Sequence, residues 1–114
     1  MGEDNLHIEN FINDKISQLM YILTALLKKS VHPTEVDIFI WDCFEEWAQL
    51  NVTDEMPSSA QERVFWHLIH ELKLGSLTNL ESDLSLSSEI EICLDFLKGK
   101  GTYPIHCVGW RPVA

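Results

Sequence analysis

Residues 35–50 read EVDIFIWDCFEEWAQL, and this stretch decides the fold. Its apolar side chains recur at steps of three and four residues, which places them on one broad stripe of a helix. The stripe consists of Val36, Phe39, Ile40, Cys43, Phe44, Trp47 and Leu50. Ile38 and Trp41 fall on the opposite side, and the carboxylates that surround them are Asp37, Asp42, Glu45 and Glu46. A helix with two apolar surfaces either touches two layers of its own fold or presents an anchor to another molecule.

Apolar periodicity elsewhere predicts three further helices. The first covers residues 5–29, and its apolar side chains occupy about half of the circumference, so it should pack against several neighbours. A helix over 58–75 is expected to begin at a serine cap and end at a glycine, and so is one over 87–99. With the helix that ends at Leu50, these elements predict an all-α fold.

The connections between these elements complete the predicted architecture. Pro33 disfavours helix for His32, and Thr34 is the expected N-cap of the second helix, with Asp37 three residues on. The aromatic-rich segment 103–112 has no helical period and should extend over the helices. We therefore expect an antiparallel bundle of four main helices with an extended C-terminal tail, forming one domain over residues 1–114.

The charge balance restricts the classes of partner. The chain has 18 Asp and Glu against 8 Lys and Arg, a formal net charge of −10. Such a field repels nucleic acid and anionic membranes and speeds encounter with basic proteins. We therefore expect a basic protein partner, no direct binding of nucleic acid and no membrane association. The alternative is that the acidity serves only solubility.

Cysteine usage and the N-terminus indicate a reducing compartment. The three cysteines have no CxxC spacing, and Cys43 and Cys93 fall on predicted core faces, where a free thiol behaves as a small hydrophobe. The acidic start of the chain lacks the pattern of a secretion signal, and no apolar run is long enough for a membrane span. A cytoplasmic location is the expectation.

No residue pattern predicts catalysis, a cofactor or a metal. The chain has neither the Gly-x-Ser-x-Gly elbow of a serine hydrolase nor a glycine-rich phosphate loop. His67 and His70 lie one turn apart with Glu71 beside them, but spacing implies no third ligand. His106 and Cys107 would contribute only if the tail folded back onto that helix. We expect a protein that is not an enzyme and has no metal site.

Residues 70–76, HELKLGS, suggest a second function. They resemble the motif of the histidine phosphotransfer domain, which is His, any residue, Leu, Lys, Gly, and His70, Leu72 and Lys73 match it. Leu74 intrudes, and Gly75 arrives one residue late, which rotates it by about 100° around the helix. The resemblance implies a phosphorelay role in which His70 accepts the phosphoryl group and Lys73 neutralises its charge.

Binding is the function that the sequence favours. Interface hot spots favour Trp at a desolvated centre with a polar rim. Trp41 with Ile38 fits the centre; the rim would comprise Asp37, Asp42, Glu45 and Glu46, extended by Asp54 and Glu55 in the following loop. Inhibitors of basic nucleases, immunity proteins, antitoxins and nucleic-acid mimics share this logic.

Two structural alternatives remain open for the aromatic side chains. Trp41 and Ile38 could pack beneath the C-terminal tail. A homodimeric assembly subunit could instead form through exposed aromatics, including a second, less acidic patch. That patch is expected to comprise Arg63, Trp66, His67, His70 and Lys73.

Overall fold

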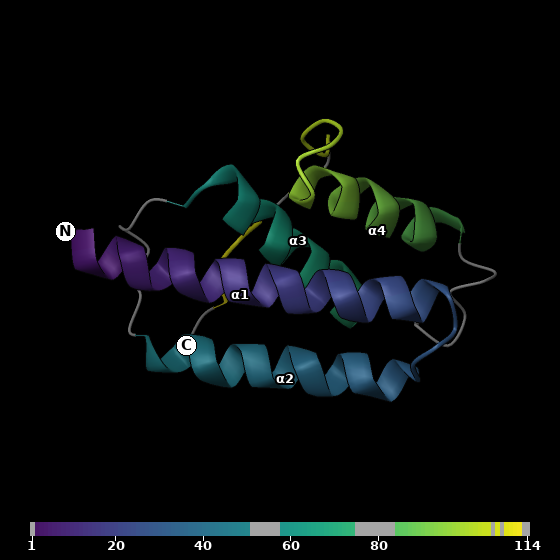
Figure 1. Ribbon diagram of the computed structural model, residues 1–114, viewed down its shortest axis with the longest axis horizontal. Helices are drawn as coiled ribbons and strands as arrows, with labels where there is room; N and C mark the ends of the chain where they lie inside the picture. Colours follow the sequence, from purple (N-terminus) through teal and green to yellow (C-terminus); the bar gives the residue numbers. More distant parts are fainter. Residues whose placement is uncertain (1, 51–57, 75–83, 106, 108, 113–114) are drawn as a thin grey trace.

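Four α-helices make up most of the chain that the computed structural model describes, which is residues 2–50, 58–74, 84–105, 107 and 109–112. They are α1 (Gly2–Leu27), α2 (Pro33–Gln49), α3 (Ala60–Leu74) and α4 (Leu84–Leu97). No strand occurs within these residues, and the predicted all-α bundle is confirmed (Figure 1). None of the described helices has both the length and the apolar character needed to cross a bilayer.

α1 and α2 form an antiparallel pair joined by a short turn (Figure 1). Lys29 adopts the left-handed conformation at φ 60°, and the Ser30 N–H donates to the Ala25 carbonyl at 2.7 Å. This C-terminal cap satisfies carbonyls of the last turn and ends α1 at Leu27, two residues before the predicted end. The helix also begins at Gly2, three residues earlier than expected.

The cap of α2 differs from the prediction. His32 takes the N-cap position in place of Thr34, and its Nδ1 accepts a hydrogen bond from the Thr34 N–H at 3.1 Å. The reason is that Pro33 suits the first helical position, where it needs no N–H partner and its φ is already helical. The helix therefore includes Pro33, and the cap moves to the residue before it.

The serine cap of α3 is confirmed, whereas α4 begins earlier than predicted. Ser59 Oγ accepts from the Glu62 N–H at 3.1 Å. α4 begins at Leu84, before the predicted start, so that Ser87 and Ser88 lie inside its first turns, where serine costs little helix stability. Gly99, at φ 81°, follows the end of α4 as expected. The predicted cap at Gly75 lies outside the described residues.

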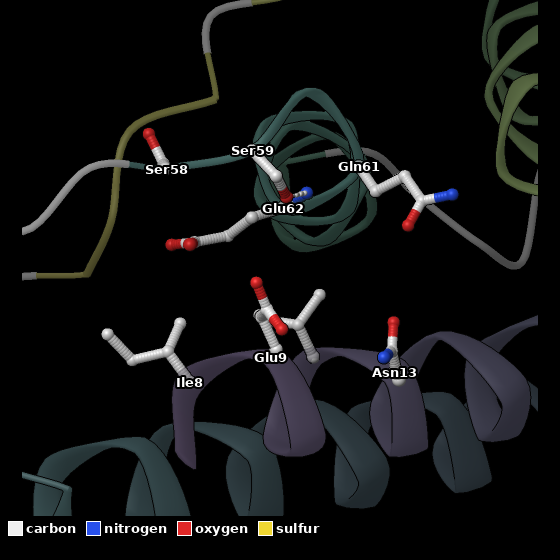
Figure 2. Close-up of a pocket in the computed structure, with 8 residues that line it drawn as sticks. Ile8, Glu9, Asn13, Ser58, Ser59, Gln61 and Glu62 are labelled. Carbon is white, nitrogen blue, oxygen red and sulfur yellow. Dashed lines mark hydrogen bonds between the residues drawn. The ribbon is translucent and has the colours of Figure 1, made fainter. Parts of the chain in front are cut away.

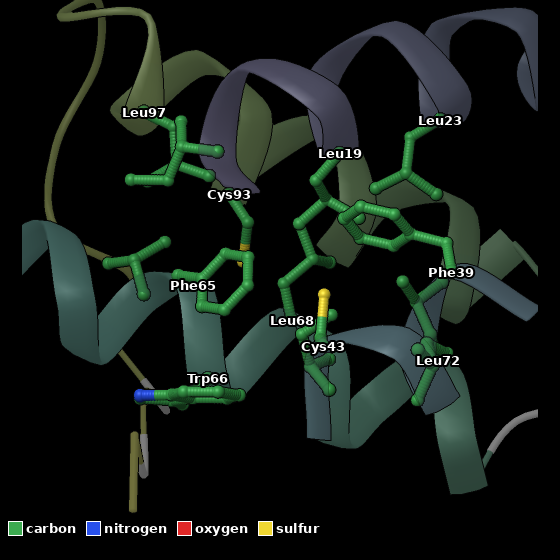
Figure 3. Packing of buried hydrophobic residues seen from close by; sticks show 14 of the residues in the cluster. Leu19, Leu23, Phe39, Cys43, Phe65, Trp66, Leu68, Leu72, Cys93 and Leu97 are labelled. Atoms are coloured by element: carbon green, nitrogen blue, oxygen red, sulfur yellow. The ribbon is translucent and has the colours of Figure 1, made fainter. Parts of the chain in front are cut away.

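The core is built by all four helices, with α3 in contact with each of the others (Figure 3). The predicted inward residues of α4 are buried, and so are those of α2 except Phe44 and Leu50, which are half-buried. The predicted outward position of Trp66 and His67 is wrong, since only 2% and 3% of their surfaces are exposed. Neighbours on three sides of α3 cover more of its circumference than its apolar stripe indicated.

Candidate functional site

The second apolar surface of α2 is exposed, as one of the sequence alternatives required. Trp41 is 63% exposed and Ile38 56% exposed. Asp37, Asp42 and Glu45 are exposed on the same helix. Burial of Trp41 beneath the C-terminal tail is therefore excluded.

Two parts of the predicted acidic rim differ from the rest. Glu46 makes an ion pair with Lys15 of α1, whose side chain is only 10% exposed, so part of its negative charge is already neutralised within the bundle. Asp54 and Glu55 lie outside the described residues. Among the described residues of this rim, Asp37, Asp42 and Glu45 are therefore the exposed carboxylates without such an ion pair to α1.

A pocket of about 660 Å³ opens beside Trp41, between α2, α3 and the tail. We call it the Trp41 pocket. Its sides are formed by residues from three parts of the chain, among which are Trp41, Phe44, Ile69, His70, Lys73 and Trp110. Trp110 is 82% exposed, so two tryptophans from segments far apart in the sequence border the opening. Most of the lining is apolar, as in typical binding clefts.

Packed aromatic rings form the floor of the Trp41 pocket. The Trp66 ring lies edge-on to Trp47, with 5.0 Å between centroids, and stacks on Phe44 at 6.4 Å. Because Trp47 and Trp66 are buried, their orientations are fixed by packing. The floor is thus rigid, while Trp41 and Trp110 at the rim are open to solvent.

The tail forms its side of the pocket through a buried ion pair. Arg111 Nη2 donates to Glu62 Oε1 at 2.8 Å, and Arg111 Nε donates to Glu62 Oε2, giving a bidentate contact. Glu62 is 2% exposed and also accepts from Trp66 Nε1 at 3.2 Å. Neither charged residue was predicted from the sequence, since no spacing pattern links two residues 49 positions apart.

A glycine brings the tail close to α3. A Cβ on Gly109 would lie 2.6 Å from the Arg63 carbonyl oxygen, and its φ of 58° also disfavours other residues. Cys107 Sγ approaches the same carbonyl at 3.6 Å. These contacts fix the tail against α3 immediately before Trp110 and Arg111.

One lysine lies on the aromatic side of the pocket. Lys73 Nζ is 5.0 Å from the Phe44 ring centroid and 6.0 Å from that of Trp41, which is cation–π geometry. Glu45 of α2 also lines the opening. The opening therefore carries both signs of charge, with a cation close to the aromatic rings and a carboxylate from α2.

The two histidines of the sequence analysis have separate environments. His70 is exposed and lines the Trp41 pocket with Lys73. His67 is buried against α4, where its Nε2 lies 2.7 Å from Glu89 Oε1. Cys93 Sγ is 3.9 Å from the same oxygen. The pKa of this thiol is raised to about 12, mainly by burial and to a smaller extent by the negative charge of Glu89. His67, Glu89 and Cys93 together could hold a metal ion, whereas His67 and His70 lie in separate environments and do not form a metal-binding pair.

A second, more polar pocket of about 480 Å³ lies between α1 and the start of α3 (Figure 2). Glu9 points toward α3 there, and Ser59 and Glu62 lie across from it. The Glu62 oxygens already accept from Arg111 and Trp66. The carboxylates of this pocket thus do not form a free pair for acid–base chemistry.

Comparisons with known protein families, with curated proteins and with solved structures found no match to this chain.

Proposed function

We propose that the protein is a non-catalytic binding module that neutralises a basic partner protein through the Trp41 pocket. One observation carries the proposal: Trp41, an exposed indole, stands beside an apolar pocket on the acidic surface of α2. Large exposed aromatics are costly to leave in water and are enriched at the centres of interfaces.

The charge of the surface favours a cationic partner. Asp37, Asp42 and Glu45 are exposed along the helix that carries Trp41, and the whole chain has a net charge of −10. Such charges at an interface rim steer a positive partner and speed its association. We therefore expect the partner to present lysine or arginine side chains toward these three carboxylates.

The pocket supplies the affinity that the charges do not. An apolar side chain from the partner would enter between Trp41 and Trp110 and rest on the floor formed by Phe44 and Trp66. Since that floor is already packed, little side-chain ordering is needed on binding. The expected biological form is an inhibitor, similar in logic to an immunity protein, an antitoxin or a nucleic-acid mimic that blocks a basic active site.

Capture from the native cell with three purified proteins tests the proposal. They are the wild type, Trp41→Ala and Tyr21→Ala; Tyr21 is an exposed aromatic on α1 and serves as the matched control. The wild type and Tyr21→Ala should retain the same basic protein, and Trp41→Ala should lose it. With the purified partner, Trp41→Ala should weaken binding about 30-fold or more.

Charge reversal at Asp42 and Glu45 separates steering from anchoring. The doubly reversed variant should slow association and blunt its dependence on salt, with a smaller effect on dissociation. An acidic captured partner, or equal retention by Trp41→Ala, would contradict the proposal. So would a wild-type dimer in sedimentation that Trp41→Ala abolishes, since a second copy would then occupy the pocket.

Phosphotransfer through His70 is the second candidate. The observation that favours it is that His70 is exposed one turn before Lys73, on a helix of a four-helix bundle. Incubation with acetyl phosphate followed by intact mass should show an acid-labile phosphoryl adduct, which His70→Ala abolishes and His32→Ala, another exposed histidine, retains. Absence of an adduct in the wild type would remove this candidate.

A further inference from the structure

A second cluster of chemically reactive side chains lies between α3 and α4, apart from the Trp41 pocket. His67 comes from α3, and Glu89 and Cys93 come from α4. One nitrogen, one oxygen and one sulfur atom from these residues lie within 4.8 Å of one another. Glu89 and Cys93 share a helix face because they are four residues apart.

The cluster is largely shielded from solvent. The side chain of His67 is 4% exposed, Cys93 is fully buried, and Glu89 is 25% exposed. Glu89 Oε1 is the shared acceptor, 2.7 Å from His67 Nε2 and 3.9 Å from Cys93 Sγ. The three atoms that could bind a metal, His67 Nε2, Glu89 Oε1 and Cys93 Sγ, thus already lie close together between the helices.

Two of the three separations, nitrogen to oxygen and sulfur to oxygen, are close to those that a tetrahedral zinc ion requires. With ordinary zinc–ligand bonds, the nitrogen–oxygen separation would be about 3.4 Å and the sulfur–oxygen separation about 3.6 Å. The carboxylate oxygen would therefore move away from His67 and toward Cys93, by less than about 1 Å. Glu89 can make this shift because its side chain is long and partly exposed.

The donor set also suits a divalent transition metal by charge and type. A carboxylate, a thiolate and a neutral imidazole carry two negative charges, which a divalent ion balances inside the bundle. On binding, the Cys93 thiol proton leaves to solvent as the sulfur–metal bond forms, and the imidazole binds through an unprotonated Nε2. Calcium and magnesium, which prefer oxygen ligands, do not fit this set.

We propose that His67, Glu89 and Cys93 bind one zinc-type divalent metal ion between α3 and α4. Three protein ligands leave one coordination position for water, which can enter on the side of the partly exposed Glu89. The ion would tie α4 to α3 and stabilise the bundle. No metal was predicted from the sequence because His67 was paired with His70 of the same helix, whereas the second and third ligands come from α4.

Cobalt(II) is the probe for the test, since it replaces zinc and absorbs light. The reduced wild-type protein, freed of metal with a chelator, should bind one Co²⁺ per chain and show a thiolate-to-cobalt charge-transfer band that zinc abolishes. Cys93→Ala should lose the band. Cys43→Ala removes an equally buried thiol on α2 and should keep it, as should Cys107→Ala, which removes the partly exposed thiol of the tail.

If Cys93→Ala folds poorly, two further measurements can still test the proposal. Glu89→Gln keeps the size of the side chain and should weaken Co²⁺ binding at least tenfold, since even loss of an outer-shell partner costs about 10- to 100-fold. Zinc should also raise the melting temperature of the wild type and of Cys43→Ala. If the wild type gives no band and no thermal shift, or if the band depends on Cys107 and not Cys93, the cluster is a hydrogen-bonded part of the core and the proposal is wrong.

Discussion

Arg111 makes a bidentate contact with both carboxylate oxygens of Glu62, a residue 49 positions earlier in the chain. The pair is buried, with side-chain exposures of 9% and 2%. The guanidinium carbon also lies 5.6 Å from the Trp47 ring centroid. This one side chain therefore connects the tail to α3 and to the floor of the Trp41 pocket.

Removal of Arg111 should destabilise the whole bundle. Arg111→Ala leaves the Glu62 carboxylate buried without its cation, and we expect a loss of about 3–5 kcal/mol in the free energy of unfolding, measured by urea titration. Lys100→Ala removes an exposed cation between α4 and the tail; it is the control and should change stability by less than about 0.5 kcal/mol. The double variant Glu62→Leu/Arg111→Met should recover most of the loss. A single variant as stable as the wild type would contradict the buried-pair interpretation.

Gly109→Ala should be more harmful than an alanine at another glycine of similar conformation. Gly101 has φ 88°, and an added Cβ there would be 3.5 Å from its nearest neighbour, so Gly101→Ala tests backbone strain alone, about 1–2 kcal/mol. Gly109→Ala adds a clash with the Arg63 backbone and should cost at least about 1 kcal/mol more. Equal losses in the two variants would show that the tail can move away from α3 without cost.

Loss of a buried tryptophan should reduce the stability of the bundle far more than loss of an exposed one. Trp66→Ala removes a buried ring that contacts several other aromatics, and we expect a loss of about 3–5 kcal/mol. Trp41→Ala removes an exposed ring and should change stability by no more than about 0.5 kcal/mol. Thermal or urea unfolding measures both. Strong destabilisation by Trp41→Ala would mean that this ring serves the fold, which would weaken its assignment to a partner.

Alkaline pH should destabilise the protein through Cys43. Burial raises the pKa of this thiol from near 9 to about 12, so the folded state keeps a proton that the unfolded state loses. The stabilising contribution is complete below about pH 9 and is lost as the pH rises toward 12. Between pH 8 and pH 10, the free energy of unfolding of Cys43→Ala should therefore fall by about 1 kcal/mol less than that of the wild type. Equal losses of unfolding free energy in the wild type and Cys43→Ala, measured in reducing buffer, would contradict this assignment. Cys107→Ala, which removes a less buried thiol, is the control and should behave as the wild type does.

Helical periodicity was enough to predict the parts of the structure that depend on one helix and one neighbour. The buried stripe of α2 and the position of Ile38 and Trp41 on the opposite side of that helix followed from their spacing, whereas their exposure to solvent did not. The inward residues of α4 followed in the same way. Such positions depend on local geometry, which the order of residues determines directly.

The remaining features depend on contacts between distant segments. Trp66 and His67 were placed outside because one apolar stripe does not reveal that α3 has neighbours on three sides. The pairing of Glu62 with Arg111, and of His67 with Glu89, joins residues 49 and 22 positions apart. No spacing rule predicts these partners, since the tertiary arrangement brings them together.

The contrast between exposed and buried tryptophans gives the protein an optical signal of its own. Trp41 and Trp110 border the pocket in contact with water, while Trp47 and Trp66 are enclosed. Acrylamide should therefore quench the red-shifted fluorescence of Trp41 and Trp110 and leave the fluorescence of Trp47 and Trp66 largely unchanged. Any molecule that fills the pocket should shift that emission to the blue and shield it from the quencher, so occupancy can be followed without a label.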